Sequence, residues 1–443
     1  MSNYCEKVRI IHHINLSVSV CIAYPDCVSL KEKFSMESEQ KKLFGLSLFL
    51  YFISASLVLL INSDFAGARA DSFFYLKMIS SANPRNSFPS IENYEVATSP
   101  VFVFLIGLLN LFVGNNLGVF VHILYILLAI ASLFLLSHLL KPTRWQVSAP
   151  IVCLLSTSGY FVAPSIWPTS DTPTIFFALL SLVSLLENRD KLFIMSSFML
   201  VSTRQNFAWL LLAFLIFEIY ANCGNLKNIA LALMRYIPAL VSLIFTFLYF
   251  ENNLTPQMYN LLNIKNVFQL PNFLTSVQIG LSMLSTVGLF LLFQNWTDLI
   301  KTFKFRFLTL VLPLSFFPLG YNFYGVNQKI GDGLGWISLL VNEINLNIFS
   351  VTVLSSFGLI LFCVLFIQGI LLQKSLPIFM LICLILSSLV MQIPFLRYFE
   401  FSVILIVCLS LRRPANLLSS LSNWKLSILS LGITLLNLLK FSA

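Results

Sequence analysis

Residues 43–61, LFGLSLFLYFISASLVLLI, form an apolar run that leads directly into NSDFAGARADSFFYLKM at residues 62–78. The run is close to the length of about 20 residues that a helix needs to cross a bilayer. Asp64 and Asp71 follow just past its end. A carboxylate at the edge of a membrane is costly unless something uses its charge. Asp71 is therefore a candidate catalytic base, and the alternative is that it only caps a short helix.

The composition of the whole chain indicates a membrane protein. Its 443 residues are 58% hydrophobic and only 10% charged. A soluble domain of this length cannot hide so much apolar surface, so we expect an all-α fold, a polytopic bundle of membrane-spanning helices. The net charge of +9 fits the collection of Lys and Arg on the cytoplasmic side of membrane proteins. It does not indicate a nucleic-acid partner.

The cysteines and histidines do not have the spacing of metal ligands. The chain has eight cysteines and four histidines, and no two cysteines form a CxxC pair. Most cysteines lie in apolar runs, which is typical of small core residues. We expect no metal and no cofactor.

Basic residues orient the first span. Residues 1–42 precede it and carry four lysines close to its start, Lys31, Lys33, Lys41 and Lys42. The positive-inside rule therefore predicts that residues 1–42 form a cytoplasmic segment.

The apolar segment at residues 100–113 is short for a span and suits a helix that lies on the membrane surface. With that placement, residues 117–139 become the second span, and Lys141 and Arg144 return to the cytoplasm, as the positive-inside rule prefers. Residues 62–116 are then one long external loop that contains interfacial helices.

Eleven further apolar runs complete a bundle of about 13 spans by the length rule. They are predicted at residues 147–164, 173–187, 191–204, 207–221, 230–250, 274–293, 307–322, 346–372, 376–394, 398–411 and 425–440. No repeat or linker interrupts the sequence after residue 42, so we interpret residues 43–443 as a single domain.

Several polar side chains remain on the predicted external face once the cytoplasmic turns are set aside. Three spans deliver an acid, an Arg-Gln pair and an Arg-Tyr pair there: Asp171, Arg204 with Gln205, and Arg397 with Tyr398. Arginines and carboxylates that meet at a membrane boundary favour a site for a phosphate and a hydroxyl nucleophile. Each residue also has a simpler interpretation, since an Asp often caps a helix and an Arg often extends to lipid headgroups.

These pieces, in this order, resemble the GT-C superfamily of membrane glycosyltransferases, and most of all its dolichyl-phosphate-glucose α-1,2-glucosyltransferase family. Four stretches carry the likeness: DSFF at 71–74, TSP at 98–100, SD at 170–171 with TRQN at 203–206, and LRYF at 396–399. The second acid of the family's Asp-Glu pair is Ser72 here, and the Asn after Arg-Gln comes one residue early, at Asn206.

The resemblance implies an enzyme that transfers a sugar, with glucose favoured, from a polyprenyl-phosphate or dolichyl-phosphate donor to a glycan or lipid-linked oligosaccharide on the non-cytoplasmic side. Asp71 would be the base, and Asp171 and Asp64 would orient the acceptor. The donor phosphate would be bound by Arg204, Gln205, Arg397 and Tyr398. Such an enzyme sits in the endoplasmic reticulum membrane of a eukaryote or the inner membrane of a bacterium, and the sequence leaves both open.

The alternative function is a polytopic transporter or a flippase for lipid-linked sugars. Transporters of this kind often contain inverted repeats with interrupted helices in matching positions. The sequence shows no such pairing, and a long external loop with surface helices is not explained by transport.

Overall fold

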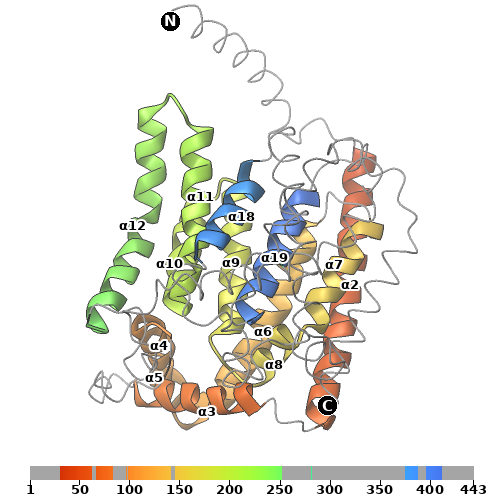
Figure 1. The fold of residues 1–443 in the computed structure, drawn as a ribbon. Helices are drawn as coiled ribbons and strands as arrows, with labels where there is room; N and C mark the ends of the chain where they lie inside the picture. The colour runs from red at the N-terminus through yellow and green to blue at the C-terminus, as the bar shows by residue number, and fades with distance from the viewer. Residues whose placement is uncertain are drawn as a thin grey trace, which may run out of the picture.

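The computed structural model describes residues 30–61, 66–82, 96, 98–140, 145–251, 281, 375–387 and 396–411. This part of the chain is mostly helical and contains no strand, which confirms the predicted all-α class (Figure 1). Four predicted spans, at residues 274–293, 307–322, 346–372 and 425–440, fall outside the described residues apart from Leu281.

Helix α2 (Leu30–Ile61) contains the first predicted span. Its stretch from Ser38 to Leu60 is long and apolar enough to cross a membrane. The helix begins well before the predicted start at residue 43, because KEKFSMESEQKK at residues 31–42 consists mostly of good helix formers. Helix α2 therefore starts inside the segment predicted to be cytoplasmic.

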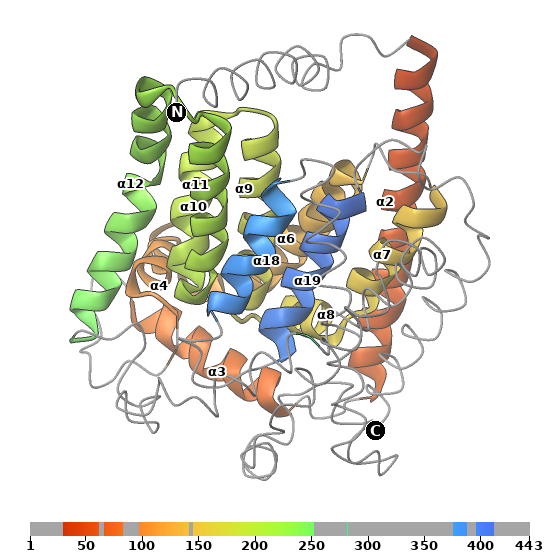
Figure 2. The same cartoon turned by 45° about the horizontal axis from the view of Figure 1, so that its top comes forward.

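Three short helices follow α2 in the chain and lie across one end of the bundle (Figures 1 and 2): α3 (Ala66–Ser81), α4 (Pro100–Gly107) and α5 (Asn110–Val113). They occupy the loop in which the sequence predicted surface helices. Helix α3 buries Tyr75, Met78 and Ile79 and exposes Phe73 and Phe74. This spacing gives the helix one packed face and one outer face. Whether that outer face lies in a membrane interface stays a prediction.

Helix α4 packs closely against the end of α3. A Cβ atom at Gly107 would lie 2.5 Å from the carbonyl oxygen of Ala82, so glycine is required for this approach. Ser99 caps the start of α4, because its Oγ accepts a hydrogen bond from the Val101 backbone N–H at 3.3 Å and Pro100 occupies the first turn. The TSP stretch thus opens the short helix, as predicted.

The remaining helices pack side by side in the bundle. They are α6 (Leu117–Leu139), α7 (Trp145–Thr157), α8 (Gly159–Ile166), α9 (Asp171–Leu186), α10 (Asp190–Thr203), η4 (Gln205–Phe207), α11 (Ala208–Ala221), α12 (Leu226–Tyr249), α18 (Ser375–Ser387) and α19 (Leu396–Leu411). Most of these bounds fall within a few residues of the predicted spans.

The single span predicted at residues 147–164 is instead two helices. The chain leaves α7 at Ser158, whose Oγ accepts a hydrogen bond from the Tyr160 backbone N–H at 3.2 Å and caps α8. A second break follows α8, and α9 departs from it at an angle of 117°. The Ser158 hydroxyl takes a backbone N–H that would otherwise join the hydrogen bonds of a continuous helix. The apolar pattern of the sequence does not show this side-chain contact, so it did not reveal the break.

Successive helices α9 to α12 run antiparallel, so their charged residues gather at two ends of the bundle. We call the end that holds the start of α9 and the end of α10 the site end. At the opposite end, Arg235 of α12 pairs with Asp190 of α10 and with Glu218 of α11. Tyr236 donates a hydrogen bond to the other oxygen of Glu218 at 2.7 Å. This network ties three helices together on the side predicted to be cytoplasmic.

Three helices in the described part of the chain are long and apolar enough to cross a membrane. They are the Ser38–Leu60 part of α2, α6 and α12, and the bent pair of α8 and α9 makes a fourth if it is one broken span. The full number of about 13 stays a prediction, since four of the predicted spans lie almost wholly outside the described residues.

Candidate functional site

The site begins with the residues that end α10. Ser202, Thr203 and Arg204 are consecutive, and their side chains bond to other helices. The Ser202 Oγ lies 2.7 Å from the Ser242 Oγ of α12, and the Thr203 Oγ1 lies 3.0 Å from the Thr174 Oγ1 of α9. Arg204 then leaves the helix with extended backbone angles, φ −146° and ψ 108°. The two hydroxyl contacts therefore fix the point at which the arginine departs.

Asp171 stands at the break between α8 and α9. It is the first residue of α9, after Ser170 at the N-cap position, so its negative charge lies at the favourable end of the helix dipole. The Ser170 side chain makes no capping bond to the helix. Thr169 instead donates to Asp171 Oδ2 at 3.3 Å. The carboxylate therefore contacts a side chain outside α9, while its position at the start of the helix also fits the alternative interpretation of a helix cap.

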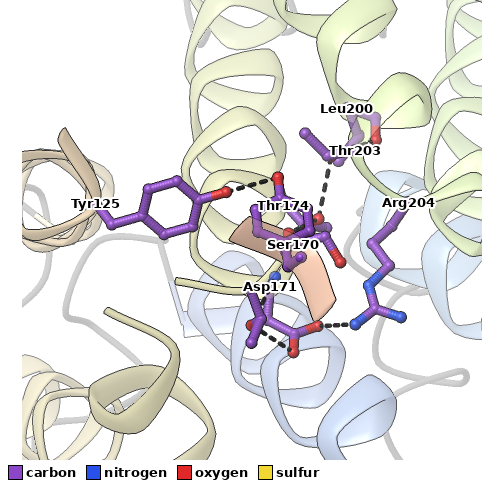
Figure 3. Close-up of polar contacts among 9 residues, drawn as sticks. Tyr125, Ser170, Asp171, Thr174, Leu200, Thr203 and Arg204 are labelled. Carbon is purple, nitrogen blue, oxygen red and sulfur yellow. Dashed lines mark hydrogen bonds and ion pairs between the residues drawn. The ribbon is translucent and has the colours of Figure 1, made fainter. Parts of the chain in front are cut away.

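Arg204 and Asp171 form an ion pair. The Arg204 Nη2 donates to Asp171 Oδ1 at 2.7 Å, as Figure 3 shows. The two side chains are only 8% and 14% exposed. Removing one partner of a buried pair typically costs about 3–5 kcal/mol, because the remaining charge is left without compensation. Arg204 therefore does not extend outward to headgroups, and the sequence prediction that Asp171 and Arg204 lie at the same end of the bundle is confirmed.

Hydroxyl groups surround the ion pair. The Thr174 Oγ1 lies 2.6 Å from the Ser170 carbonyl oxygen, and the Thr203 Oγ1 donates to the Leu200 carbonyl oxygen at 2.7 Å. Tyr125 reaches in from α6 toward the start of α9 (Figure 3). This neighbourhood is buried yet polar, which strengthens electrostatic interactions relative to water.

Helix α3 brings Tyr75 to the same place. Tyr125 donates a hydrogen bond to the Tyr75 hydroxyl at 2.7 Å. Burial raises the pKa of Tyr75 above its ordinary value, so this phenol is neutral at physiological pH. Asp71 lies one turn earlier on α3, on the face that carries Tyr75. The structure describes the backbone of Asp71 but not its side chain.

Helix α19 approaches the site from the C-terminal part of the chain. The rings of Phe207 in η4 and Phe401 in α19 are 6.3 Å apart between centroids. Arg397 and Tyr398 lie in the first turn of α19, about one turn before Phe401. Gln205 begins η4 and is buried. The structure thus brings the backbone of the LRYF stretch near the TRQN stretch.

Four of the predicted site residues lie wholly or partly outside the described residues, and the Asp71 side chain is one of these. The side chains of Arg397 and Tyr398 lie outside the described residues, as does Asp64 altogether. Among the described residues, no group of three or more His, Cys, Asp and Glu side chains could hold a metal ion. What the described part offers is a guanidinium, a carboxylate and hydroxyls, a set suited to phosphate and sugar oxygens.

The sequence analysis assigned no role to Tyr75, Tyr125 or Thr174, and it named Thr203 only as part of the TRQN stretch. Tyr75 has one signal, since it follows Asp71 by four residues and so shares its helix face. Tyr125 has none, because it lies in a uniformly apolar span whose rotation about its own axis the pattern does not determine.

No protein-family model, no curated protein and no solved structure matches the chain.

Proposed function

We propose that the chain is a membrane glycosyltransferase that uses a polyprenyl-phosphate or dolichyl-phosphate sugar. Glucose is the favoured sugar, and the acceptor is a glycan or lipid-linked oligosaccharide on the non-cytoplasmic side. The observation that carries this proposal is the buried pair of Arg204 and Asp171 beside α3, the helix on which Asp71 lies.

The reaction requires a base and a stabilised leaving group. The acceptor hydroxyl attacks the anomeric carbon of the donor and gives its proton to the Asp71 carboxylate. The bond between that carbon and the phosphate oxygen breaks, and the lipid phosphate leaves with the electron pair. Arg204 and Arg397 neutralise the charge that builds on this phosphate, and Asp171 orients Arg204.

The pairing of Arg204 with Asp171 supports this division of roles. Both oxygens of the Asp171 carboxylate already accept hydrogen bonds, from Arg204 and Thr169. A carboxylate engaged in this way is a poor proton acceptor, because protonation would weaken the ion pair. Asp171 therefore suits a positioning role, and the base is assigned to Asp71.

One observation favours the alternative of a transporter or flippase. The break between α8 and α9 places an ionisable residue, Asp171, beside an interrupted helix, and interrupted helices form the substrate sites of many transporters. A flippase would move a lipid-linked sugar between leaflets without breaking a bond. The two functions are therefore separated by whether a glycosidic bond forms.

The decisive experiment uses membranes that contain the full-length chain, supplied with radiolabelled polyprenyl-phosphate glucose and then with other hexose donors. We expect Asp71→Asn to reduce transfer by about 10²–10⁴-fold while the protein still binds donor, because the substitution removes the basic oxygen but keeps the shape.

The matched control is Asp64→Asn, seven residues earlier. Near-normal transfer by this variant assigns the base to Asp71, and the reverse pattern moves it to Asp64. If both variants transfer normally, the proposed reaction has lost its base. If the unchanged protein moves labelled lipid across sealed vesicles without forming a glycoside, the flippase function replaces the proposed one.

A further inference from the structure

Two tyrosine hydroxyls join α3 to α6 inside the bundle. Tyr125 donates to Tyr75 at 2.7 Å, and the two rings meet edge to face with centroids 6.2 Å apart. Tyr75 is 2% exposed and Tyr125 is fully buried. A buried hydrogen bond between two phenols holds both rings in one orientation, since a hydroxyl left without its partner there is costly.

This pair lies close to the ion pair of Arg204 and Asp171, since the Tyr125 side chain points from α6 toward the start of α9, where the two charges meet (Figure 3). Four elements therefore meet at one point: α3 through Tyr75, α6 through Tyr125, α9 through Asp171 and the end of α10 through Arg204.

The hydrogen bond between Tyr75 and Tyr125 matters for the site because Tyr75 lies close to Asp71 on α3. Asp71 precedes Tyr75 by four residues, which is one helical turn, or about 6 Å along the axis. A helix transmits a rotation or a shift over such a distance almost unchanged, because its backbone hydrogen bonds hold it rigid. Whatever fixes Tyr75 therefore also fixes the backbone of Asp71 relative to Arg204.

We propose that Tyr75, held by Tyr125, is a positioning residue that sets α3, and with it Asp71, against the Arg204–Asp171 pair. This inference rests on the proposed function for its catalytic consequence. Tyr75 itself touches no reacting atom in this scheme; it acts through the placement of the base. A displacement of about 1 Å of a catalytic group lowers turnover by up to about 100-fold.

The test compares three single variants of the full-length protein. Tyr75→Phe and Tyr125→Phe each delete one hydroxyl and keep the ring. Tyr51→Phe is the matched control, because Tyr51 is equally buried and its hydroxyl bonds Ser165 at 2.7 Å, joining α2 to α8. All three variants lose one buried hydrogen bond, so a general loss of stability affects them alike.

Two readouts are measured on each variant. The first is hydrogen exchange of the α3 amides without substrate, which we expect to accelerate in Tyr75→Phe and Tyr125→Phe but not in Tyr51→Phe. The second is sugar transfer, for which we expect kcat to fall by between about 10-fold and 100-fold in the first two variants with KM unchanged. The double variant should be no worse than either single one, because the two hydroxyls form one contact.

The outcomes separate the two proposals. If the unchanged protein transfers sugar and Tyr75→Phe has the same kcat as Tyr51→Phe, the positioning role is overturned and the proposed function stands. If exchange in α3 accelerates as expected but the unchanged protein transfers no sugar, the proposed function fails and the mechanical link remains. Unchanged exchange in α3 overturns the link itself.

Discussion

Arg204 owes its orientation to the two residues before it. Ser202 bonds α12 and Thr203 bonds α9, so the backbone is held on both sides before the arginine leaves the helix. The Arg204 Nη2 then lies 2.7 Å from the Asp171 Oδ1, and both side chains are largely buried. A buried charge in such a setting depends on its partner more than on any other contact.

A double-mutant cycle on this pair gives the residue-scale prediction. We expect Asp171→Asn or Arg204→Gln alone to lower the free energy of unfolding by about 3–5 kcal/mol, since each leaves one buried charge uncompensated. The double variant should lose less than the sum, with a coupling of about 0.5–3 kcal/mol. Thermal unfolding of the purified protein in detergent measures each change.

The control for this cycle is Asp190→Asn at the opposite end of the bundle. Asp190 also pairs with an arginine, but its side chain is 63% exposed. Exposed ion pairs contribute about 0–1 kcal/mol, so this variant should unfold close to the unchanged protein. If Asp171→Asn and Asp190→Asn lower the free energy of unfolding equally, burial does not make the Arg204–Asp171 pair the more important of the two.

At the scale of elements, the contact between α3 and α4 depends on a missing side chain. The backbone of Ala82 occupies the space where a Cβ of residue 107 would lie. This contact packs the end of α3 against α4 at the site end, so it affects the position of both helices.

Gly107→Ala should therefore destabilise the protein by about 1–3 kcal/mol, the usual cost of overpacking, because the neighbouring atom is backbone and cannot rotate away. Gly45→Ala is the matched control, since α2 leaves open space around that residue. There the substitution should be neutral or stabilising by up to about 1 kcal/mol, as alanine is the better helix former. The midpoint of thermal unfolding is measured for both variants. A lower midpoint for Gly107→Ala than for Gly45→Ala supports a tightly packed contact between α3 and α4, and equal midpoints contradict it.

At the scale of the whole molecule, the two ends of the bundle predict two sides of a membrane. Ser80 of α3 is exposed at the site end, and the native Cys223 is exposed in the turn between α11 and α12 at the opposite end. In a background without the other cysteines, an impermeant thiol reagent applied to the non-cytoplasmic side of sealed membranes should label Ser80→Cys and leave Cys223 unlabelled. The reverse pattern would invert the proposed orientation.

Most of the helix ranges between residues 145 and 251 could be predicted, because each apolar run there ends at polar or proline-containing turns. The shared end of Asp171 and Arg204 could also be predicted, since consecutive antiparallel helices return to the same side. The contact between them could not, because it depends on how far α9 bends away from α8. The early start of α2 was missed because only its apolar part was read as helical. Its first turns are charged, but Lys, Glu and Gln are themselves good helix formers.

The ion pairs also bear on the order in which the chain is made. Asp171 and Arg204 are separated by 33 residues, Asp190 and Arg235 by 45, and Glu218 and Arg235 by 17. Synthesis proceeds from the N-terminus, so each of these charges meets its counter-charge as soon as the next one or two helices leave the ribosome. None of these three pairs waits for a residue beyond Arg235. A growing chain built in this way can enter a bilayer hairpin by hairpin with these charges already paired.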